Sequence, residues 1–407
     1  MMWRIRAVVM AGAVVAGAGL GGAVSVAAST AVSACDTVIS APGTYVLAAD
    51  LDCSTSATDG VVIESSNVTL NLDGYSISGG TGANDYTGVY VYSGGELNHV
   101  TVENGTIADW EYDLYPDGVS NFTASKLTLA VDGSYDYYGF YGENIDHGSL
   151  SKVNLTGSAY IGFYIEYSAD LTVTASSADS GEYGFYGEYN DADSYVNDTA
   201  NTNSEYGFYE YESSAITFST NRANDSESGI YNYCDDAGAT TLEHNTVADN
   251  GYGIYLYDCY GYSKTVIIDS LIKSNVADDN LYGIYDEESF GASYVDNVAK
   301  YNGDYGMLLE YPADDTVTGN VASHNGDSGI YLEENYAYDD VDSASNNQAY
   351  YNDDYGLYAD SAAPGSGNVA LDNSPYDCFN FVCASGSSLA PGPAASMPGL
   401  TGLGSAS

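Results

Sequence analysis

A short segment that recurs at a nearly constant spacing constrains the fold more than any other feature of the chain. It reads glycine, an apolar residue and usually tyrosine, as in Gly329-Ile330-Tyr331-Leu332. Other copies begin at Gly88, Gly139, Gly162, Gly184, Gly207, Gly229, Gly253, Gly283, Gly306 and Gly356. The spacing is 22 to 24 residues from Gly139 to Gly253 and 23 to 30 residues beyond it. Such a period is typical of a solenoid, in which each coil buries its apolar side against its neighbours.

Each copy has the alternation of a short β-strand. Side chains of a strand point alternately to its two faces, so the residue after glycine should point inward and the following tyrosine outward. The position four residues after glycine should share the outward face with that tyrosine. It is occupied by Tyr92, Glu143, Glu166, Glu188, Tyr211, Tyr233, Tyr257, Glu287, Glu310, Glu333 and Asp360. We therefore expect an outward column of tyrosines with a column of acids and tyrosines beside it.

A second strand and a turn follow in each repeat, as in Asn297-Val298-Ala299 and Asn320-Val321-Ala322, where asparagine suits a left-handed turn position. The period, the Gly-Ile-Tyr-Leu strand and the Asn-Val-Ala turn together resemble the right-handed parallel β-helix, or pectin-lyase-like, family over roughly residues 35–383. The resemblance implies an all-β, single-stranded right-handed parallel β-helix of about a dozen coils of 22–23 residues. This fold carries many unrelated activities, so it does not by itself give the function.

The two ends of the chain differ in composition from the repeats. Residues 1–34 are expected to be an export signal, with Arg4 and Arg6 before an apolar run and a cleavage site at Val32-Ser33-Ala34. The same residues, followed by Cys35, also fit a lipoprotein cleavage box, which would leave Cys35 lipidated. Residues 35–384 form the predicted β-helix with its two caps. Residues 385–407 are rich in Ser, Gly, Ala and Pro and are expected to be disordered.

Six cysteines occur in three close pairs, and an even number in an exported chain favours disulfides. The pairs are Cys35 with Cys53, Cys234 with Cys259, and Cys378 with Cys383. Sequence alone leaves the connectivity open. No Cys-x-x-Cys pair is present, which disfavours a cysteine metal site.

The net charge of the chain restricts the kinds of molecule that it can bind. The formal net charge is −49, and removal of Arg4 and Arg6 with a signal would make it more negative. Such a field repels nucleic acid, anionic membranes and polyuronic acids, and it attracts cations. Solubility or adaptation to high salt would explain it, and so would calcium, structural or catalytic, although no cofactor is required. Paired aspartates that could bind calcium are Asp235-Asp236, Asp278-Asp279, Asp314-Asp315, Asp339-Asp340 and Asp353-Asp354.

The outward columns are the strongest candidate for a binding site. Tyrosine offers a flat apolar ring with a polar tip, which suits sugar rings. The candidate substrate-binding residues are Tyr141, Tyr164, Tyr186, Tyr209, Tyr211, Tyr231, Tyr233, Tyr255 and Tyr257. Glycoside hydrolysis needs two carboxylates, which Glu143, Glu166 and Glu188 on neighbouring coils could supply. The columns also fit a purely structural ladder, because they repeat along most of the chain.

A second constellation would suit a polysaccharide lyase. Lys126, His147 and Asp170 each follow a glycine by eight residues, if Gly118 marks a repeat as Gly139 and Gly162 do. They could act as base, acid and orienting group on three neighbouring coils. Against this, the chain lacks the Gly-His-Gly and Arg-Ile-Lys motifs of polygalacturonases that share the fold, and its basic residues are scattered.

The leading expectation is a secreted, monomeric, acidic β-helix protein that binds a polysaccharide or cell-surface glycan through its Tyr/Glu columns. The first alternative is a polysaccharide-degrading enzyme, either a hydrolase or a lyase. The second is a structural extracellular protein stabilised by cations. Whether the chain is an enzyme is left open by the sequence.

Overall fold

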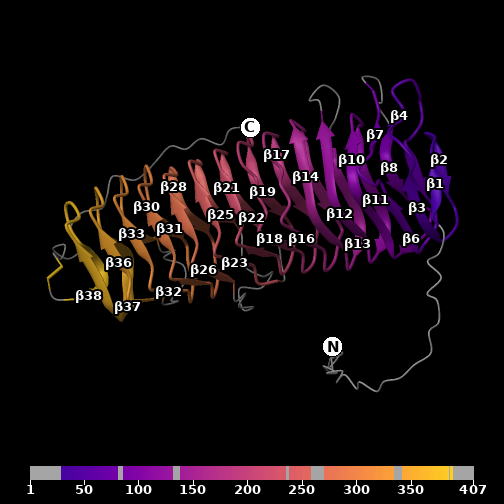
Figure 1. The fold of residues 1–407 in the computed structure, drawn as a ribbon. Helices are drawn as coiled ribbons and strands as arrows, with labels where there is room; N and C mark the ends of the chain where they lie inside the picture. The colour runs from indigo at the N-terminus through magenta and orange to yellow at the C-terminus, as the bar shows by residue number, and fades with distance from the viewer. Residues whose placement is uncertain are drawn as a thin grey trace, which may run out of the picture.

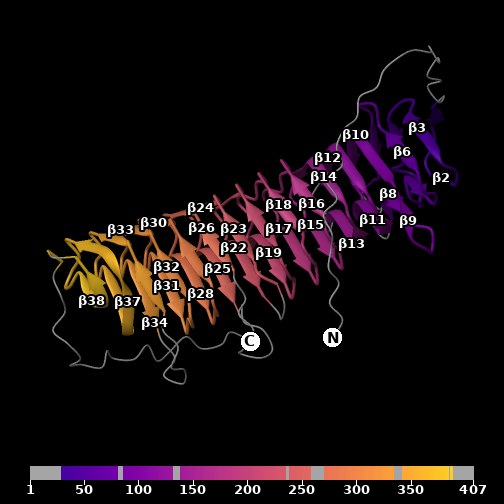
Figure 2. The ribbon, with the colours of Figure 1, turned by 90° about the horizontal axis from the view of Figure 1, so that it is seen from below.

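The computed structural model describes residues 29–80, 86–131, 138–234, 238–257, 270–333, 342–384 and 386–387. The chain winds into an elongated solenoid whose coils follow one another from the N-terminal to the C-terminal end (Figures 1 and 2). Every strand pairs in parallel with a strand of the neighbouring coils, and the described residues contain no α-helix. The structure confirms the predicted parallel β-helix.

Three ladders of parallel strands run along the solenoid. The first contains β2 (Thr37–Ile39), β5 (Val61–Ile63), β8 (Thr87–Val91), β9 (Leu97–Asn98), β11 (Tyr112–Ser120), β13 (Tyr138–Asp146), β15 (Ile161–Glu166), β17 (Tyr183–Glu188), β19 (Tyr206–Tyr211), β22 (Ser228–Tyr233), β25 (Tyr252–Tyr257), β28 (Tyr282–Glu287), β31 (Met307–Glu310), β34 (Ile330–Glu333), β37 (Leu357–Leu371) and β38 (Cys378–Cys383).

The second ladder contains β1 (Thr30–Val32), β3 (Gly43–Leu47), β6 (Val68–Asn71), β10 (Val100–Ala108), β12 (Thr123–Val131), β14 (Ser149–Gly157), β16 (Thr172–Thr174), β18 (Ser194–Val196), β20 (Thr217–Ser219), β23 (Thr241–Glu243), β26 (Leu271–Lys273), β29 (Ser293–Val295), β32 (Thr316–Thr318) and β35 (Ser343–Ser345), and β4 (Leu51–Asp52) and β7 (Ser76–Ser78) join it at β10. The third contains β21 (Arg222–Asn224), β24 (Thr246–Ala248), β27 (Val276–Asp278), β30 (Val298–Lys300), β33 (Val321–Ser323) and β36 (Gln348–Tyr350), and it ends on β37.

The residue after each repeat glycine is buried in the lumen, as the alternation predicts. Phe163, Phe185 and Phe208 stack there with ring centroids 4.6 and 4.8 Å apart, and aliphatic residues continue the stack in later coils. Each coil thus covers the apolar surface of the next, which removes it from water.

The repeat glycine is required by the close approach of neighbouring coils rather than by its backbone angles. A Cβ atom at Gly207 would lie 2.6 Å from the carbonyl oxygen of Gly229, and one at Gly253 would lie 2.5 Å from that of Gly283. Real Cβ atoms do not approach a backbone oxygen so closely, so a side chain here would push two coils apart. The glycine column therefore fixes the stacking distance along the first ladder.

Two ladders of buried asparagines hold successive coils together. In each, the side-chain oxygen of one asparagine accepts hydrogen bonds from the preceding ladder member, and its amide nitrogen donates to a backbone carbonyl. One ladder contains Asn221, Asn245, Asn275, Asn297, Asn320, Asn347 and Asn368, and the other contains Asn250, Asn280, Asn302, Asn325, Asn352 and Asn373.

The expected left-handed backbone lies one residue before these asparagines. Asp296 before Asn297 has φ 55°, and Gly319 before Asn320 has φ 73°. The asparagines themselves are present because a side-chain amide can both donate and accept in a lumen that contains little water.

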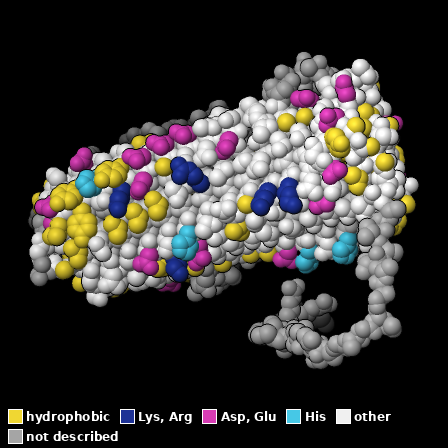
Figure 3. All heavy atoms as spheres, in the orientation of Figure 1, with side chains coloured by type: hydrophobic (Ala, Val, Ile, Leu, Met, Phe, Trp, Pro, Cys, Tyr) yellow, Lys and Arg dark blue, Asp and Glu magenta, His cyan; other side chains and the backbone are white. Residues whose placement is uncertain are grey.

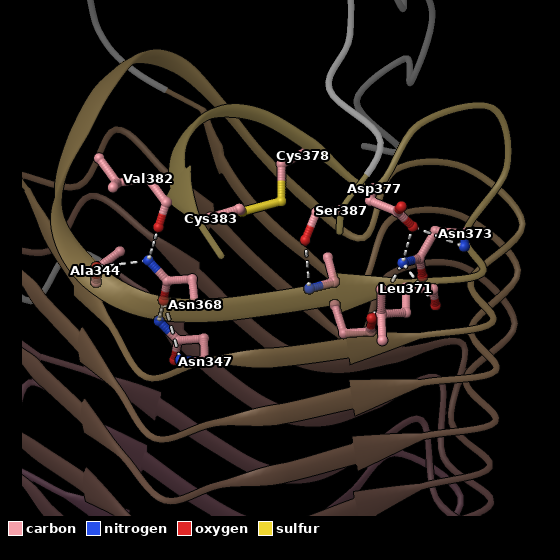
Figure 4. Close-up of a disulfide and its surroundings, with 12 residues drawn as sticks. Ala344, Asn347, Asn368, Leu371, Asn373, Asp377, Cys378, Val382, Cys383 and Ser387 are labelled. Atoms are coloured by element: carbon pink, nitrogen blue, oxygen red, sulfur yellow. Dashed lines mark hydrogen bonds between the residues drawn. A yellow bond between two sulfur atoms is a disulfide. The ribbon is translucent and has the colours of Figure 1, made fainter. Parts of the chain in front are cut away.

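The C-terminal cap terminates both asparagine ladders (Figure 4). Asn368 donates to the carbonyl oxygen of Val382 in β38, and Asn373 donates to the carboxylate of Asp377. A disulfide joins Cys378 to Cys383 across the same segment. The cap thus supplies the partners that a further coil would have given.

At the N-terminal end, a disulfide joins Cys35 to Cys53, as predicted. That bond uses the sulfur that lipidation would need, so the structure does not support the lipid-anchor alternative. Strand β1 lies within the stretch assigned to the export signal, and its Val32 is buried against the core. The cleavage position stays a prediction.

Some expectations concern residues that the structure does not describe. They are the export signal up to residue 28, Cys259 as the partner of Cys234, the pairs Asp235-Asp236 and Asp339-Asp340, and nearly all of the tail beyond residue 384. In the described residues, no helix is long and apolar enough to cross a membrane.

Asn347→Ala should destabilise the fold much more than Gln348→Ala, although the residues are adjacent. Asn347 accepts from Asn320 and donates to the carbonyl of Val317 and to Asn368, whereas Gln348 is exposed. Each buried polar group left without a partner costs roughly 1–3 kcal/mol, so we expect a loss of about 2–5 kcal/mol in the free energy of unfolding. Denaturant unfolding measures it, and equal losses for the two variants would contradict the ladder's role.

Candidate functional site

The outward side of the first ladder, from β11 to β34, is called the tyrosine face below. Register pairs Tyr141 with Tyr164, Tyr186, Tyr209, Tyr231, Tyr255 and Tyr285 in succession, so the predicted tyrosine column forms. The column beside it pairs Glu143 with Glu166, Glu188, Tyr211, Tyr233, Tyr257, Glu287, Glu310 and Glu333. All these side chains are partly exposed, and none points into the lumen.

The rings of the tyrosine column cover one another. Tyr164 and Tyr186 stack with centroids 5.1 Å apart, and Tyr186 and Tyr209 with centroids 4.8 Å apart. Ring faces therefore point along the solenoid axis, and edges and hydroxyl groups are left for a ligand. The expectation that flat ring faces would receive sugar rings is wrong for this part of the column.

Several tyrosine hydroxyls are bound to a carboxylate of the next coil. Tyr141 donates to Glu166 at 2.5 Å, and Tyr164 donates to Glu188 at 2.9 Å. Tyr115 donates to Glu143, and Tyr255 donates to Glu287. Burial, followed by the bond to the carboxylate, raises the pKa of the Tyr141 and Tyr164 phenols, so they stay protonated donors.

In the middle of the face the pattern changes, because tyrosine replaces glutamate in the second column. On the coil after Tyr186, the second column has Tyr211 in place of a glutamate. In the same way, Tyr233 follows Tyr209 and Tyr257 follows Tyr231. The hydroxyls of Tyr186, Tyr209 and Tyr231 have no hydrogen-bond partner among the residues that the structure describes. The face thus has a central strip of available phenol hydroxyls between two groups of acids.

The acids of the second column affect one another. Glu166 lies in register between Glu143 and Glu188. Burial raises the pKa of Glu166, and both neighbouring carboxylates raise it further, while the hydroxyl of Tyr141 lowers it. Partial burial likewise raises the pKa of Glu310 and Glu333 at the other end.

Sequence reasoning missed a set of acids inside the lumen. Glu210 is fully buried, accepts a hydrogen bond from the Tyr195 hydroxyl at 2.6 Å, and occupies space that a Cβ atom at Gly187 would need. Asp286 is bonded in the same way to Tyr294. Burial raises the pKa of both carboxyls to about 7. The available signal was their position three residues after the repeat glycine, where the other coils have an uncharged residue.

A further tyrosine column was also missed. The residue before the repeat glycine is tyrosine in many coils, and these side chains flank the main column. Tyr138 lies 5.2 Å from Tyr141, and Tyr183 lies 5.3 Å from Tyr186. The recurring Tyr-Gly pair was the signal, and the added rings widen the face.

The second predicted constellation comes together only in part. His147 contacts Asp170, with Nε2 3.3 Å from Oδ2, and Asp146, with Nδ1 2.6 Å from Oδ1. Lys126 lies elsewhere, because its neighbours Ser125 and Leu127 pair with Ser151 and Val153 on the second ladder. Gly118 is not a repeat glycine: register sets Tyr112 opposite Tyr138, so Asp113 lies opposite Gly139. The alignment of all three residues was therefore wrong.

Asp146, His147 and Asp170 are the only group of three donors suited to a metal within the described residues, and all three are exposed. The aspartate pairs proposed for calcium form no such group there. Asp315 instead points into the lumen and accepts the backbone N–H of Ala292 at 2.8 Å. Calcium binding stays a prediction.

The basic residues lie away from the tyrosine face. The Lys and Arg residues of the described strands are Lys126, Lys152, Arg222, Lys273 and Lys300, all on the second and third ladders. Figure 3 shows such side chains distributed over one side of the solenoid. The strands of the first ladder contain no Lys, Arg or His. Among the described strands, basic residues are therefore confined to the second and third ladders, whereas acidic residues occur on all three.

Comparison with known proteins identifies the fold. The family described as right handed beta helix region matches residues 228–390, and the family described as periplasmic copper-binding protein (NosD) matches residues 120–285. No curated protein matches the sequence.

Solved structures similar to this chain include the A-module of the mannuronan C-5 epimerase AlgE6 of Azotobacter vinelandii, at 16% identity and a TM-score of 0.52. It covers 84% of this chain and 89% of its own. The T265N mutant of the periplasmic alginate epimerase AlgG has 14% identity and a TM-score of 0.51. The match covers 85% of this chain and 79% of the AlgG chain. At these identities the similarity establishes the fold alone.

The copper-binding description does not fit the residues present. Copper sites are built from imidazole, thiolate and thioether ligands. The candidate group contains one imidazole, and both of its nitrogens already contact carboxylates. Cys35, Cys53, Cys378 and Cys383 are bound in disulfides.

The lumenal acids predict that stability falls as the pH rises. Glu210 has a pKa of about 7 when folded and an ordinary acidic pKa when unfolded. Its contribution is fully present below the unfolded pKa and is lost as the pH rises through the folded pKa. Unfolding free energy measured against pH should fall for this group by about 2–3 kcal/mol between about pH 5 and pH 8.

Glu210→Gln should flatten that dependence, because glutamine does not ionise. The control is Glu243→Gln on β23, outside the lumen, which should leave the slope unchanged. An unchanged slope in Glu210→Gln would contradict a buried neutral carboxyl.

Proposed function

Because the chain belongs to the right-handed parallel β-helix family, we propose that it is an exported, non-catalytic protein that binds a polysaccharide along its tyrosine face. The disulfides suit the oxidising compartments outside the cytoplasm. The solved structures that share its fold are named as epimerases of mannuronan and alginate, which accords with a polysaccharide ligand. The proposal itself rests on the face, since a fold does not give a function.

The observation that carries the proposal is the central strip of Tyr186, Tyr209 and Tyr231. Their rings are held by stacking at 4.8 and 5.1 Å, so their hydroxyls occupy fixed positions without further ordering on binding. These hydroxyls have no partner among the described residues, and each can donate to and accept from a sugar hydroxyl. The strip repeats once per coil, which suits a polymer with a repeating unit.

The same regularity argues against catalysis on this face. A catalytic pair needs two carboxylates in different environments, so that one is protonated and the other ionised. Glu143, Glu166 and Glu188 occupy equivalent positions on successive coils, and similar positions recur at Glu310 and Glu333. Repetition of one environment supports a binding surface.

A hydrolase is the second candidate, and Glu166 is the observation that favours it. Burial and two neighbouring carboxylates raise its pKa, which would suit a general acid. A lyase using Lys126 with His147 has less support, because these residues lie on different ladders. A structural protein stabilised by cations is the remaining alternative.

Replacing Tyr186, Tyr209 and Tyr231 by phenylalanine should weaken polysaccharide binding while leaving the stack intact. Each lost hydrogen bond is worth about 1 kcal/mol, so the triple variant should bind at least about tenfold more weakly. The measurement is affinity electrophoresis in gels containing neutral, acidic or basic polysaccharides. Tyr301→Phe is the control, because Tyr301 is exposed and lies outside the strands of the tyrosine face.

Product assays on the same panel separate the alternatives. Retention without new reducing ends or unsaturated products is the expected result. Products abolished by Glu166→Gln would establish the hydrolase instead, and products that require Lys126 would establish a lyase. If the protein shows no retention and forms no products, a structural role is the reading that is left.

A further inference from the structure

We propose that the ligand of the tyrosine face is a cationic glycan, a polymer of amino sugars whose ammonium groups contact the glutamates beside the central strip. This inference rests on the proposed polysaccharide binding and specifies its chemical class. It follows from the absence of basic residues from the described strands of the tyrosine face, which the sequence alone did not reveal.

The first observation is the charge of the face. Glu143, Glu166 and Glu188 lie at one end of the central strip, and Glu287, Glu310 and Glu333 lie at the other. No Lys, Arg or His occurs in the strands of this ladder, and the five basic residues of the described strands all lie on the other two. A ligand on this face therefore meets carboxylates without a competing cation from the same strands.

The second observation is the spacing of those carboxylates. Neighbouring parallel strands lie about 4.8 Å apart, so Glu143, Glu166 and Glu188 form a row of like charges in register. Like charges at such distances destabilise one another, and a cation between them removes that repulsion. A polymer with an ammonium group on each unit can contact several members of the row at once, which multiplies its affinity.

The third observation is the set of hydrogen bonds that the carboxylate oxygens accept. Glu166 and Glu188 each accept a phenol hydroxyl from the preceding coil, through Oε1 and Oε2 respectively. Those bonds hold each carboxylate in place on the outer side of its strand, where the side chain is partly exposed. The edges of the tyrosine rings beside them provide the apolar surface on which a sugar backbone can lie.

The same arrangement disfavours other glycans. A polyuronic acid would place its carboxylates against those of the face, in a protein with a formal charge of −49. A neutral glycan can use the hydroxyls of Tyr186, Tyr209 and Tyr231, but it leaves the repulsion within the glutamate rows unchanged. Amino sugars provide both hydroxyl groups and positive charge.

The test compares two ligands that differ only in charge. Isothermal titration calorimetry would use a fully deacetylated chitin oligosaccharide and the N-acetylated oligosaccharide of equal length, at a mildly acidic pH where the amines are protonated. The wild-type protein should bind the deacetylated oligosaccharide at least about tenfold more tightly, because each exposed ion pair contributes a little and several form together.

A variant in which both glutamate rows are replaced should lose most of that preference while still binding the N-acetylated oligosaccharide. Its substitutions are Glu143→Gln, Glu166→Gln, Glu188→Gln, Glu287→Gln, Glu310→Gln and Glu333→Gln. The control variant Glu103→Gln removes one acid from β10 on the second ladder and should behave as the wild type. Circular dichroism would confirm that all variants are folded.

The outcomes distinguish this inference from the proposed function. Equal binding of the two oligosaccharides, or a preference that survives when both glutamate rows are replaced, would overturn the cationic ligand and leave polysaccharide binding in place. Absence of binding to both, together with no retention on any polysaccharide, would overturn the proposed function itself. Polylysine that binds as tightly as the deacetylated oligosaccharide would reduce the effect to general charge attraction and would also overturn the inference.

Discussion

The buried side-chain amides of one coil depend on the next coil for their hydrogen-bond partners, and the rest of the structure follows from this. An asparagine such as Asn320 is satisfied only when Asn297, Asn347 and the backbone of Tyr294 lie in register with it. Because an unpaired buried amide is expensive, slippage of one coil against another is strongly disfavoured. The glycine column permits the close approach that these bonds require. Register is therefore fixed inside the solenoid.

Fixed register inside determines the surface outside. Once Phe163, Phe185 and Phe208 stack in the lumen, the tyrosine that follows each of them must stack on the outer side of the same strand. Where the next coil has a glutamate in the second column, as at Glu166 and Glu188, the tyrosine hydroxyl reaches its carboxylate. Stability and the candidate binding surface therefore come from one periodic arrangement. The tyrosine face is rigid because the strands that present it are held in register.

The architecture could be predicted largely from the sequence, because it depends on periodicity. The inward position after each glycine and the outward tyrosine follow from spacing and alternation. The sequence left the disulfide connectivity open, and the structure joins Cys35 to Cys53 and Cys378 to Cys383. The early coils were harder, because Asp113 occupies the place of a repeat glycine there, and Gly118 was aligned in its stead. That five-residue error displaced Lys126 from its true neighbours.

The details of the site could not be predicted, because they depend on side-chain directions. Stacking of Tyr186 on Tyr209 covers the ring faces that a sugar was expected to use, and only coordinates show this. Glu210 was not singled out from the sequence, although its inward position next to Gly187 makes it part of the core. Of the described aspartate pairs, only Asp314-Asp315 has a member in the lumen, because Asp315 is buried while Asp314 is exposed.

The central claim is that one side of the solenoid, the tyrosine face, recognises the ligand. Hydroxyl-radical footprinting read by mass spectrometry, with and without the deacetylated chitin oligosaccharide, tests it most directly. The account predicts reduced oxidation of Tyr186, Tyr209 and Tyr231 and unchanged oxidation of the exposed Tyr301 and Tyr351, which lie at another corner of the coils. Protection of Tyr301 and Tyr351, with the tyrosine face unchanged, would contradict it.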